Sequence, residues 1–532
     1  MTEQEEEKLF ARKSSGLVKE ANSVRALFFN WIDTMGTKFG WSVAYLGLIS
    51  APLILGFPSL LWFFVIMIAV DVVLGIVYVQ VVTPMPRSGA DYVVPSRVMG
   101  PFWGWINSWM IIWGWMPLWG YMGSIMIRNL QLIVGMLNVA GVTGSAAWIA
   151  SSPWTWIIGM LTVILGMIFC LIPPKRMYAL FVAIGVLGII GFAGVLVGAA
   201  VGASNFAANL QSITGMSVSQ IEQTAAADGF SLSGTLTYAA IAGLMGYVVF
   251  AALGGTYPGS IAGELRGDIK KTLAISIFGM LAVYFVYQIL YVWGLAKMLG
   301  YEAVASWSYL YWNTNSAPLG LPPINGLLAQ IAIPSLWPLW VVMALAGLAA
   351  VWAIVPASML YINRQMLYWG MDRMLPKSIT TMWRGVPWKI FVIEGVGAAI
   401  FFYFTIEGLN PVVYFWWSDL LSFTALLFPA VCGIIIALKR KQILEAVPWK
   451  RWLLPMSILL ICLIVPIYFF GCFAGGFGNT PGQSVWSYAV DSGLVITAGV
   501  IVAGVVVYYA VRAYNTKRGV LVNQIFKEIP PE

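Results

Sequence analysis

The sequence has no histidine and few charged residues. Only 9% of its 532 residues are Asp, Glu, Lys or Arg, whereas soluble proteins contain about 25%. Without histidine, a histidine-ligated metal and a histidine proton relay are excluded. The cysteines lack a C-x-x-C spacing and lie in or at the ends of apolar runs, so we interpret them as small core residues. They are Cys170, Cys432, Cys462 and Cys472. We therefore expect neither a metal site nor a cofactor.

Apolar residues are abundant, at 60% of the chain. A membrane-spanning helix needs about 20 of them in succession. The pattern predicts an all-α polytopic membrane protein with twelve spans. The predicted spans are 27–52, 58–83, 101–133, 153–172, 177–202, 236–257, 272–298, 336–361, 388–406, 412–438, 452–472 and 488–512.

The basic residues lie mainly on one side of these spans. Of 29 Lys and Arg residues, only Lys38, Arg128 and Lys297 fall within spans or near the far face. Basic loops remain in the cytoplasm. We therefore expect a multi-pass protein of the cell membrane with both termini cytoplasmic. The formal net charge of +8 is spread over short loops, so it does not indicate nucleic acid as a partner.

Two spans contain glycine-rich interruptions. The first span carries two glycines and a lysine within 35–40, although a lysine at bilayer depth costs roughly 2.5–3.5 kcal/mol. The sixth has two glycines at 254–255. Interrupted helices at matching positions in two halves indicate a binding site, although glycines in membrane helices also serve as close-packing points. The predicted substrate-binding residues are Met35, Gly36, Thr37, Lys38, Phe39, Gly40, Phe250, Ala251, Ala252, Leu253, Gly254 and Gly255.

Three segments resemble signatures of the amino acid–polyamine–organocation (APC) transporter superfamily. The loop after span two reads MPRSGADYVVPSR at 85–97 and GPFWGW at 100–105, similar to the family's "MPRAGGDYVY…SR…GPFWGF". Residues 250–264 are similar to "FAFxGF…EE", and 363–387 to "SRxLYAMARDGxLP…GVP". The resemblance covers essentially the whole chain. It implies a LeuT-like five-plus-five inverted repeat with broken helices 1 and 6, two further helices, and secondary transport of amino acids or related amines and acids.

The same resemblance places Gly36, Thr37 and Lys38 on the family's G-(S/T)-G. There, free backbone amides bind the substrate carboxylate and span-six carbonyls meet its ammonium group. The sequence departs from the family pattern at Lys38, at Ala252 in place of an aromatic residue, and at Thr256 in place of an acidic one. These departures argue against an ordinary small neutral amino acid as substrate.

The resemblance also divides the chain into segments. We expect a cytoplasmic tail at 1–26, a first repeat at 27–202, an extracellular loop at 203–235 and a second repeat at 236–438. The last two spans with their basic loop occupy 439–513, and 514–532 form a second cytoplasmic tail.

Several charged residues lie inside predicted spans. With a rise of 1.5 Å per residue, Lys38 and Asp71 both fall about 16–20 Å from the face where their span begins. Together with Asp33 they are the candidate coupling residues. Lys38 either binds a substrate anion, forms a structural ion pair with Asp71, or carries a proton during transport. Glu394 and Asp419 lie on helices that the resemblance places outside the substrate site.

The sequence thus predicts a permease that works by alternating access, and no enzyme. Residues 336–357, in the span where this fold would use hydroxyl groups to bind sodium, contain no Ser or Thr. We therefore expect proton-coupled, sodium-independent symport. The alternatives are uncoupled antiport of an amino acid against an amine or organic acid, and a sensor that binds without transporting. The sequence does not indicate the substrate or the oligomeric state.

Overall fold

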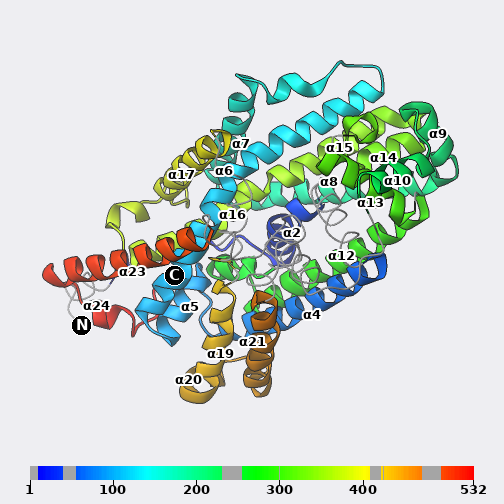
Figure 1. Cartoon of the computed structure of the whole chain (residues 1–532). Helices are drawn as coiled ribbons and strands as arrows, with labels where there is room; N and C mark the ends of the chain where they lie inside the picture. The colour runs from blue at the N-terminus through cyan, green and yellow to red at the C-terminus, as the bar shows by residue number, and fades with distance from the viewer. Residues whose placement is uncertain are drawn as a thin grey trace.

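The structure is a computed structural model that describes residues 10–39, 56–230, 255–298, 300–314, 316–407, 421–422, 424–469 and 493–531. Within these ranges the chain is helical, with two isolated β-bridges and no strand. In Figure 1, α5 and α24 lie toward one end of the molecule, α9, α10 and α13 lie toward the other, and α4, α6 and α12 run between these ends.

Most of the predicted spans correspond to helices where the structure describes them. Span 388–406 coincides with α17, and 58–83 lies within two residues of α4. The long helices are α2 (Ser23–Phe39), α4 (Gly56–Val82), α6 (Pro101–Val139), α7 (Trp154–Cys170), α8 (Pro174–Val201), α12 (Ile269–Met298), α15 (Trp337–Trp352), α16 (Ile354–Met371), α17 (Trp388–Ile406), α19 (Leu427–Lys439), α21 (Leu453–Phe469) and α23 (Gly493–Lys517). Six helical stretches of the described chain are long and apolar enough to cross a membrane.

Span eight differs from its prediction, because it consists of two helices. The chain turns at Ala353 between α15 and α16, and α16 continues to Met371. Pro356 has no N–H group to donate to the carbonyl of Trp352, so the helical hydrogen-bond ladder is interrupted there. A span read from hydropathy alone does not reveal this interruption.

The predicted loops also contain helices. The segment after span two forms α5 (Ala90–Val98), and the predicted outer loops fold into short helices. These are α9 (Phe206–Thr214), α10 (Val218–Ala227), α13 (Tyr301–Tyr309) and α14 (Asn325–Ala332). On the other side lie α20 (Lys441–Glu445) and α24 (Val522–Ile525). Each has ten residues or fewer and is too short to cross a membrane.

Helix α2 lies near the centre of the bundle (Figure 1). It contacts α8, α12, α15 and α16. Phe29 packs against two aromatic rings of α8, with its centroid 6.4 Å from Tyr178 and 5.9 Å from Phe181. Because α2 is enclosed on several sides, every polar group on its buried surface needs a partner from the surrounding helices.

Two tryptophans of α6 bind α23. The indole N–H of Trp105 donates to the Gly504 carbonyl at 2.9 Å, and that of Trp109 donates to the Val500 carbonyl at 2.8 Å. Trp105 also stacks on Trp369 of α16, with the two ring centroids 4.2 Å apart. These contacts fix α23 against the bundle while most of its surface remains available to lipid.

Both terminal segments lie on one face of the molecule. The Ala11 amide donates to the Met371 carbonyl at 2.9 Å, and Asn515 donates to the Arg373 carbonyl at 2.7 Å. The side-chain Nε of Arg97 donates to the Glu528 carbonyl. The even number of spans predicted from the sequence requires this arrangement.

Two of the cysteine predictions are confirmed and one is wrong. Cys170 and Cys432 are buried core residues, whereas Cys462 of α21 is exposed. A helix at the edge of a membrane bundle presents apolar residues to lipid as readily as to the core, so hydropathy does not separate the two. Cys472 lies outside the described residues.

Helices α8 and α15 cross closely at Gly191, which yields a testable prediction. A Cβ atom there would lie 2.6 Å from the Met343 carbonyl oxygen. Gly191→Ala should therefore force the helix backbones apart and destabilise the protein by about 1–3 kcal/mol, measured as a lower apparent Tm of the detergent-purified protein.

The matched control is Gly499→Ala in α23, where nothing lies within 4 Å of the added methyl group. The control should keep or slightly raise the apparent Tm, because alanine favours a helix over glycine by about 0.5–1 kcal/mol. Equal Tm values for the two variants would show that the α8–α15 crossing is not tight.

Candidate functional site

At Gly255, the described end of the second glycine-rich segment, the chain contacts the side chain of Asn30. This residue lies on α2 and is fully buried. Its amide nitrogen donates to the Gly255 carbonyl at 2.8 Å and to the Ser276 carbonyl of α12 at 3.0 Å. One asparagine thus joins the first span, the end of the sixth and the start of the seventh.

The backbone at Gly255 is not α-helical. Gly255 has φ 90°, and a Cβ atom there would lie 2.5 Å from the Met280 Cε. The chain continues as a buried 3₁₀-helix, η3 (Tyr257–Glu264). Only glycine adopts this φ readily, so a glycine at this position permits the change in chain direction.

The first helix differs from the sequence-based expectation. Helix α2 remains helical through Phe39, so the described backbone does not open at Gly36, Thr37 and Lys38. A glycine costs a helix only about 1 kcal/mol, which packing of α2 at the centre of the bundle can outweigh. Gly40 and the residues Phe250, Ala251, Ala252, Leu253 and Gly254 lie outside the described residues, as do the side chains of 35–39.

Two of the predicted intramembrane carboxylates are buried in the bundle. Asp33 of α2 is 3% exposed and Asp71 of α4 is 2% exposed. Asp33 lies near Tyr361 of α16, with which it interacts electrostatically. The expected pairing of Asp71 with Lys38 depends on the side chain of Lys38, which lies outside the described residues. Asp419 lies outside them as well. Glu394 of α17 is fully buried.

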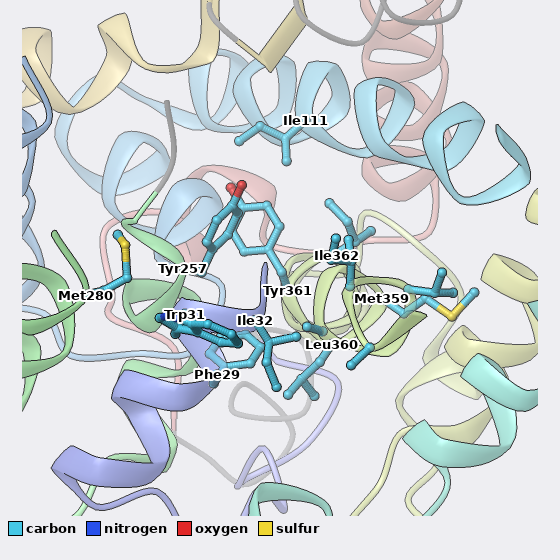
Figure 2. Packing of buried hydrophobic residues seen from close by; sticks show 14 of the residues in the cluster. Phe29, Trp31, Ile32, Ile111, Tyr257, Met280, Met359, Leu360, Tyr361 and Ile362 are labelled. Carbon is cyan, nitrogen blue, oxygen red and sulfur yellow. The ribbon is translucent and has the colours of Figure 1, made fainter. Parts of the chain in front are cut away.

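Three aromatic side chains form a layer beneath this junction. Figure 2 shows Tyr257 of η3 and Tyr361 of α16 side by side near Trp31 and Ile32 of α2. The two tyrosine rings are perpendicular, with centroids 4.9 Å apart. Trp115 of α6 packs edge-on against both, at 5.8 Å and 6.3 Å. The three rings thus join η3, α16 and α6 next to Gly255.

A buried ion pair lies about one helical turn beyond Tyr361 on α16. The guanidinium of Arg364 binds Glu264 through two hydrogen bonds, 2.6 Å and 3.1 Å long. The side chains are 1% and 0% exposed. Tyr178 of α8 donates to the same carboxylate at 3.1 Å. This pair holds η3, α16 and α8 together.

A second ion pair lies closer to the same face. Arg97 of α5 binds Asp372 with contacts of 2.5 Å and 2.8 Å, and Tyr92 donates to that carboxylate at 2.9 Å. The C-terminal segment covers this pair, because the Phe526 ring lies 5.1 Å from the Arg97 guanidinium carbon. This pair holds α5, the residue that follows α16 and the C-terminal segment together.

The opposite end of the molecule is more open. A cavity of about 500 Å³ lies at the last turns of α6, between α9 and the segments that flank α13. Its polar lining includes Arg128, Gln131 and Tyr311. The described part of the molecule thus has two buried ion pairs at the end that carries the terminal segments and a cavity at the other.

Five charged residues near the end that carries the terminal segments have no role in the sequence-based prediction. Asp91, Arg97, Glu264, Arg364 and Asp372 all lie within the three family-like segments. Their chemistry was available from the sequence, because a charged residue within an apolar protein needs a partner. Which carboxylate meets which arginine depends on contacts between positions 100–275 residues apart, and the sequence alone does not give those contacts.

The Arg364–Glu264 pair generates a prediction about stability. Glu264→Gln leaves a buried guanidinium without its counter-charge and should cost about 3–5 kcal/mol. The control is Glu445→Gln in the Lys450–Glu445 pair, whose side chains are 51% and 72% exposed. That change should cost at most about 1 kcal/mol. Thermal unfolding of the two purified variants measures both effects, and equal losses would contradict the structural role given to Glu264.

Comparison with known proteins agrees with this architecture. The family described as "Amino acid permease" matches residues 24–502. Among solved structures, the crystal structure of MhsT in complex with L-phenylalanine is similar, with a TM-score of 0.54 at 13% identity. The match covers 85% of this chain and 99% of that chain. No curated protein matches the sequence.

The family match covers most of the chain, and the structural similarity shows a LeuT-like transporter fold at an identity too low to carry more than the fold. The expected polytopic membrane protein and its superfamily are thereby confirmed, and the chain belongs to the amino acid permease family.

Proposed function

We propose that this permease moves amino acids or closely related amines and carboxylic acids across the cell membrane by proton-coupled, sodium-independent alternating access. The observation that carries the proposal is the Asn30 junction, where α2, Gly255 and α12 meet inside an apolar bundle. Backbone groups beside a helix interruption are suited to bind the charged ends of a small zwitterion.

The substrate-binding residues proposed are those flanking this junction on both segments, 35–40 and 250–255. Because α2 is helical through Phe39 in this structure, the helix must unwind at Gly36, Thr37 and Lys38 before their amide groups can bind the carboxylate. Carbonyl groups near Gly255 bind the ammonium group. The similar structure contains L-phenylalanine, which makes amino acids the first class to test. Lys38 adds a positive charge to the carboxylate side.

The asymmetry between the two ends of the molecule supports alternating access. Two buried arginine–carboxylate pairs close one end, and a cavity lies at the other. The closed end carries the basic loops and the terminal segments, so we assign it to the cytoplasm. The structure then corresponds to a state that is closed toward the cytoplasm.

The first test of this function is ligand binding. Detergent-purified protein is screened by thermal shift against amino acids, amines and small carboxylic acids at several pH values. A ligand at 100 times its Kd stabilises the folded protein by about 2.7 kcal/mol, so a true substrate should raise the apparent Tm. Stabilisation by amino acids or their carboxylate analogues is expected, and absence of any shift across these classes would contradict the proposal.

Transport separates a carrier from a sensor that only binds. In proteoliposomes, a carrier exchanges external labelled substrate for unlabelled internal substrate, whereas a sensor does not accumulate label. We expect counterflow, and uptake that responds to a pH gradient and not to sodium. Sodium-dependent uptake at fixed pH would contradict this coupling, and uptake without any ion dependence would favour the antiporter alternative.

The role of Lys38 is tested by Lys38→Met. Methionine keeps much of the length of the side chain and removes its charge. If Lys38 takes part in proton coupling, the variant loses uptake driven by a pH gradient and keeps substrate exchange. Full proton-driven uptake in the variant would assign Lys38 to structure instead. Loss of binding in the thermal-shift assay would assign it to the substrate carboxylate.

A further inference from the structure

Asp91 differs from the other buried carboxylates that close the cytoplasmic end. It lies near the start of α5 and is 5% exposed. Its carboxylate accepts a hydrogen bond of 2.9 Å from the Tyr361 hydroxyl. Glu264 and Asp372 each bind an arginine through two hydrogen bonds, whereas Asp91 makes no ion pair with the Lys and Arg side chains described.

The start of α5 is fixed tightly against its neighbours. Gly89 has φ 68°, and its amide donates to the Ser260 carbonyl of η3 at 2.7 Å. A Cβ atom on Gly89 would lie 2.7 Å from the Arg364 carbonyl oxygen of α16. Asn107 of α6 donates to the Asp91 carbonyl at 2.6 Å. Asp91 is therefore held at the junction of α5 with η3, α16 and α6, the segments that must separate if this end opens.

The groups around Asp91 are mostly neutral. Tyr361 of α16 donates to it, and Tyr257 of η3 packs against the Tyr361 ring. From α19, Cys432 is close enough to Asp91 to interact electrostatically. Tyr78 of α4 lies against Gly259 of η3.

The remaining charged and titratable neighbours are already engaged. On α5 itself, Tyr92 and Arg97 bind Asp372. On α16, Arg364 binds Glu264. The polar neighbour from α6, Asn107, is uncharged and contacts the backbone of Asp91, not its carboxylate. Asp33 of α2, a further buried carboxylate, interacts electrostatically with Tyr361. Arg97 and Arg364 are neutralised by Asp372 and Glu264, so the Asp91 carboxyl is buried without a cation of its own among the described Lys and Arg side chains.

This environment favours the protonated carboxyl. Removal from water raises the pKa of Asp91 from 3.8 to about 7, although the hydrogen bonds from Tyr361 and from the backbone of Asp91 oppose the increase. A carboxyl group with a pKa near neutrality gains and loses its proton easily at physiological pH. Exposure to water would return the pKa toward the ordinary range of an aspartic acid.

We propose that Asp91 is a proton-binding site of this permease, which holds a proton while α5 is seated on η3 and α16 and releases it when that junction opens. On release, the bond between Oδ and hydrogen breaks, the proton passes to water at the cytoplasmic face, and the carboxylate remains hydrogen-bonded to Tyr361. The site couples opening of the cytoplasmic end to proton release. The proposal rests on the proposed transport function and adds to it a proton-binding residue, Asp91, that acts independently of the role tested at Lys38.

Protonation of Asp91 is measurable without any substrate. Infrared difference spectra of the full-length protein in liposomes, recorded while the pH is raised through neutrality, should contain the carbonyl stretching band of a carboxylic acid that loses its proton with a midpoint near 7. The band should be missing in Asp91→Asn. If the wild-type and Asp91→Asn spectra agree throughout the titration, Asp91 is not a proton-binding site.

Neighbouring variants test the geometry. Tyr361→Phe removes a donor that stabilises the ionised carboxylate, so the midpoint should rise. Tyr92→Phe is the matched control, because Tyr92 donates to Asp372 instead, and it should leave the midpoint unchanged. Gly89→Ala should displace α5 from the Arg364 carbonyl, admit water and lower the midpoint. A midpoint that does not respond to Tyr361→Phe or Gly89→Ala overturns the proposed site.

The pH dependence of stability is a second measurement that keeps the proposal testable if a spectrum is weak. The folded state holds the Asp91 proton more tightly than the unfolded chain does, so this residue makes stability fall as pH rises from 3.8 to about 7. Asp91→Asn should remove that part of the pH dependence of the apparent Tm. An identical pH dependence in both proteins would contradict the assignment.

Coupling is tested last, by uptake of a labelled amino acid mixture into proteoliposomes under a pH gradient. The wild type should concentrate label in response to the gradient, and Asp91→Asn should lose this response. Equal responses overturn the coupling role of Asp91, even if the infrared titration is positive. A titrating Asp91 in a protein that moves no amino acid contradicts the proposed function and, with it, the coupling role, while the proton site itself remains established by its spectrum.

Discussion

The structure depends on pairing polar groups inside an apolar bundle. An unsatisfied buried donor or acceptor costs about 1–3 kcal/mol, and water is scarce at this depth. Asn30 meets this constraint for two carbonyl groups at once, those of Gly255 and Ser276. Gly255 has a left-handed φ of 90°, and its carbonyl receives a hydrogen bond from a side chain of another helix. This hydrogen bonding creates a polar position in the middle of the molecule.

The same constraint shapes the cytoplasmic end as we assign it. Arg364 and Arg97 lie where isolated charges would be very costly, and each is neutralised by a carboxylate through two hydrogen bonds. A buried ion pair tolerates little displacement of either side chain, because moving one partner leaves the charge of the other uncompensated. A transporter that opens here must therefore exchange these contacts for water. Asp91 has a neutral partner instead, and it can adapt to the same movement by giving up a proton.

Much of the fold could be predicted from the sequence, because membrane spans follow from local composition. Span 388–406 illustrates this, since it coincides with α17. The division of span eight at Ala353 was missed, although Pro356 was visible as a cause. The continuation of α2 through Phe39 was also missed, because packing around α2 outweighs the small helix penalty of Gly36. Local propensity does not measure that packing.

The candidate site was predictable only in part. The sequence indicated that two glycine-rich segments belong together, and Asn30 does bring α2 to Gly255. The partners of Asp91, Glu264 and Asp372 come from residues far away in the chain. Their pairing depends on how α5, η3 and α16 pack, which no local pattern contains. The family-like motifs contain these charged residues, but they do not indicate which partner each one binds.

The most direct test of the account is an experimental structure of the protein in a lipid nanodisc with an amino acid that stabilises it. We predict that the ligand lies beside α2 and the backbone at Gly255, with the Asn30 hydrogen bonds and the two arginine–carboxylate pairs intact. An amino acid bound only in the Arg128 cavity, with no space beside the Asn30 junction, would contradict the account.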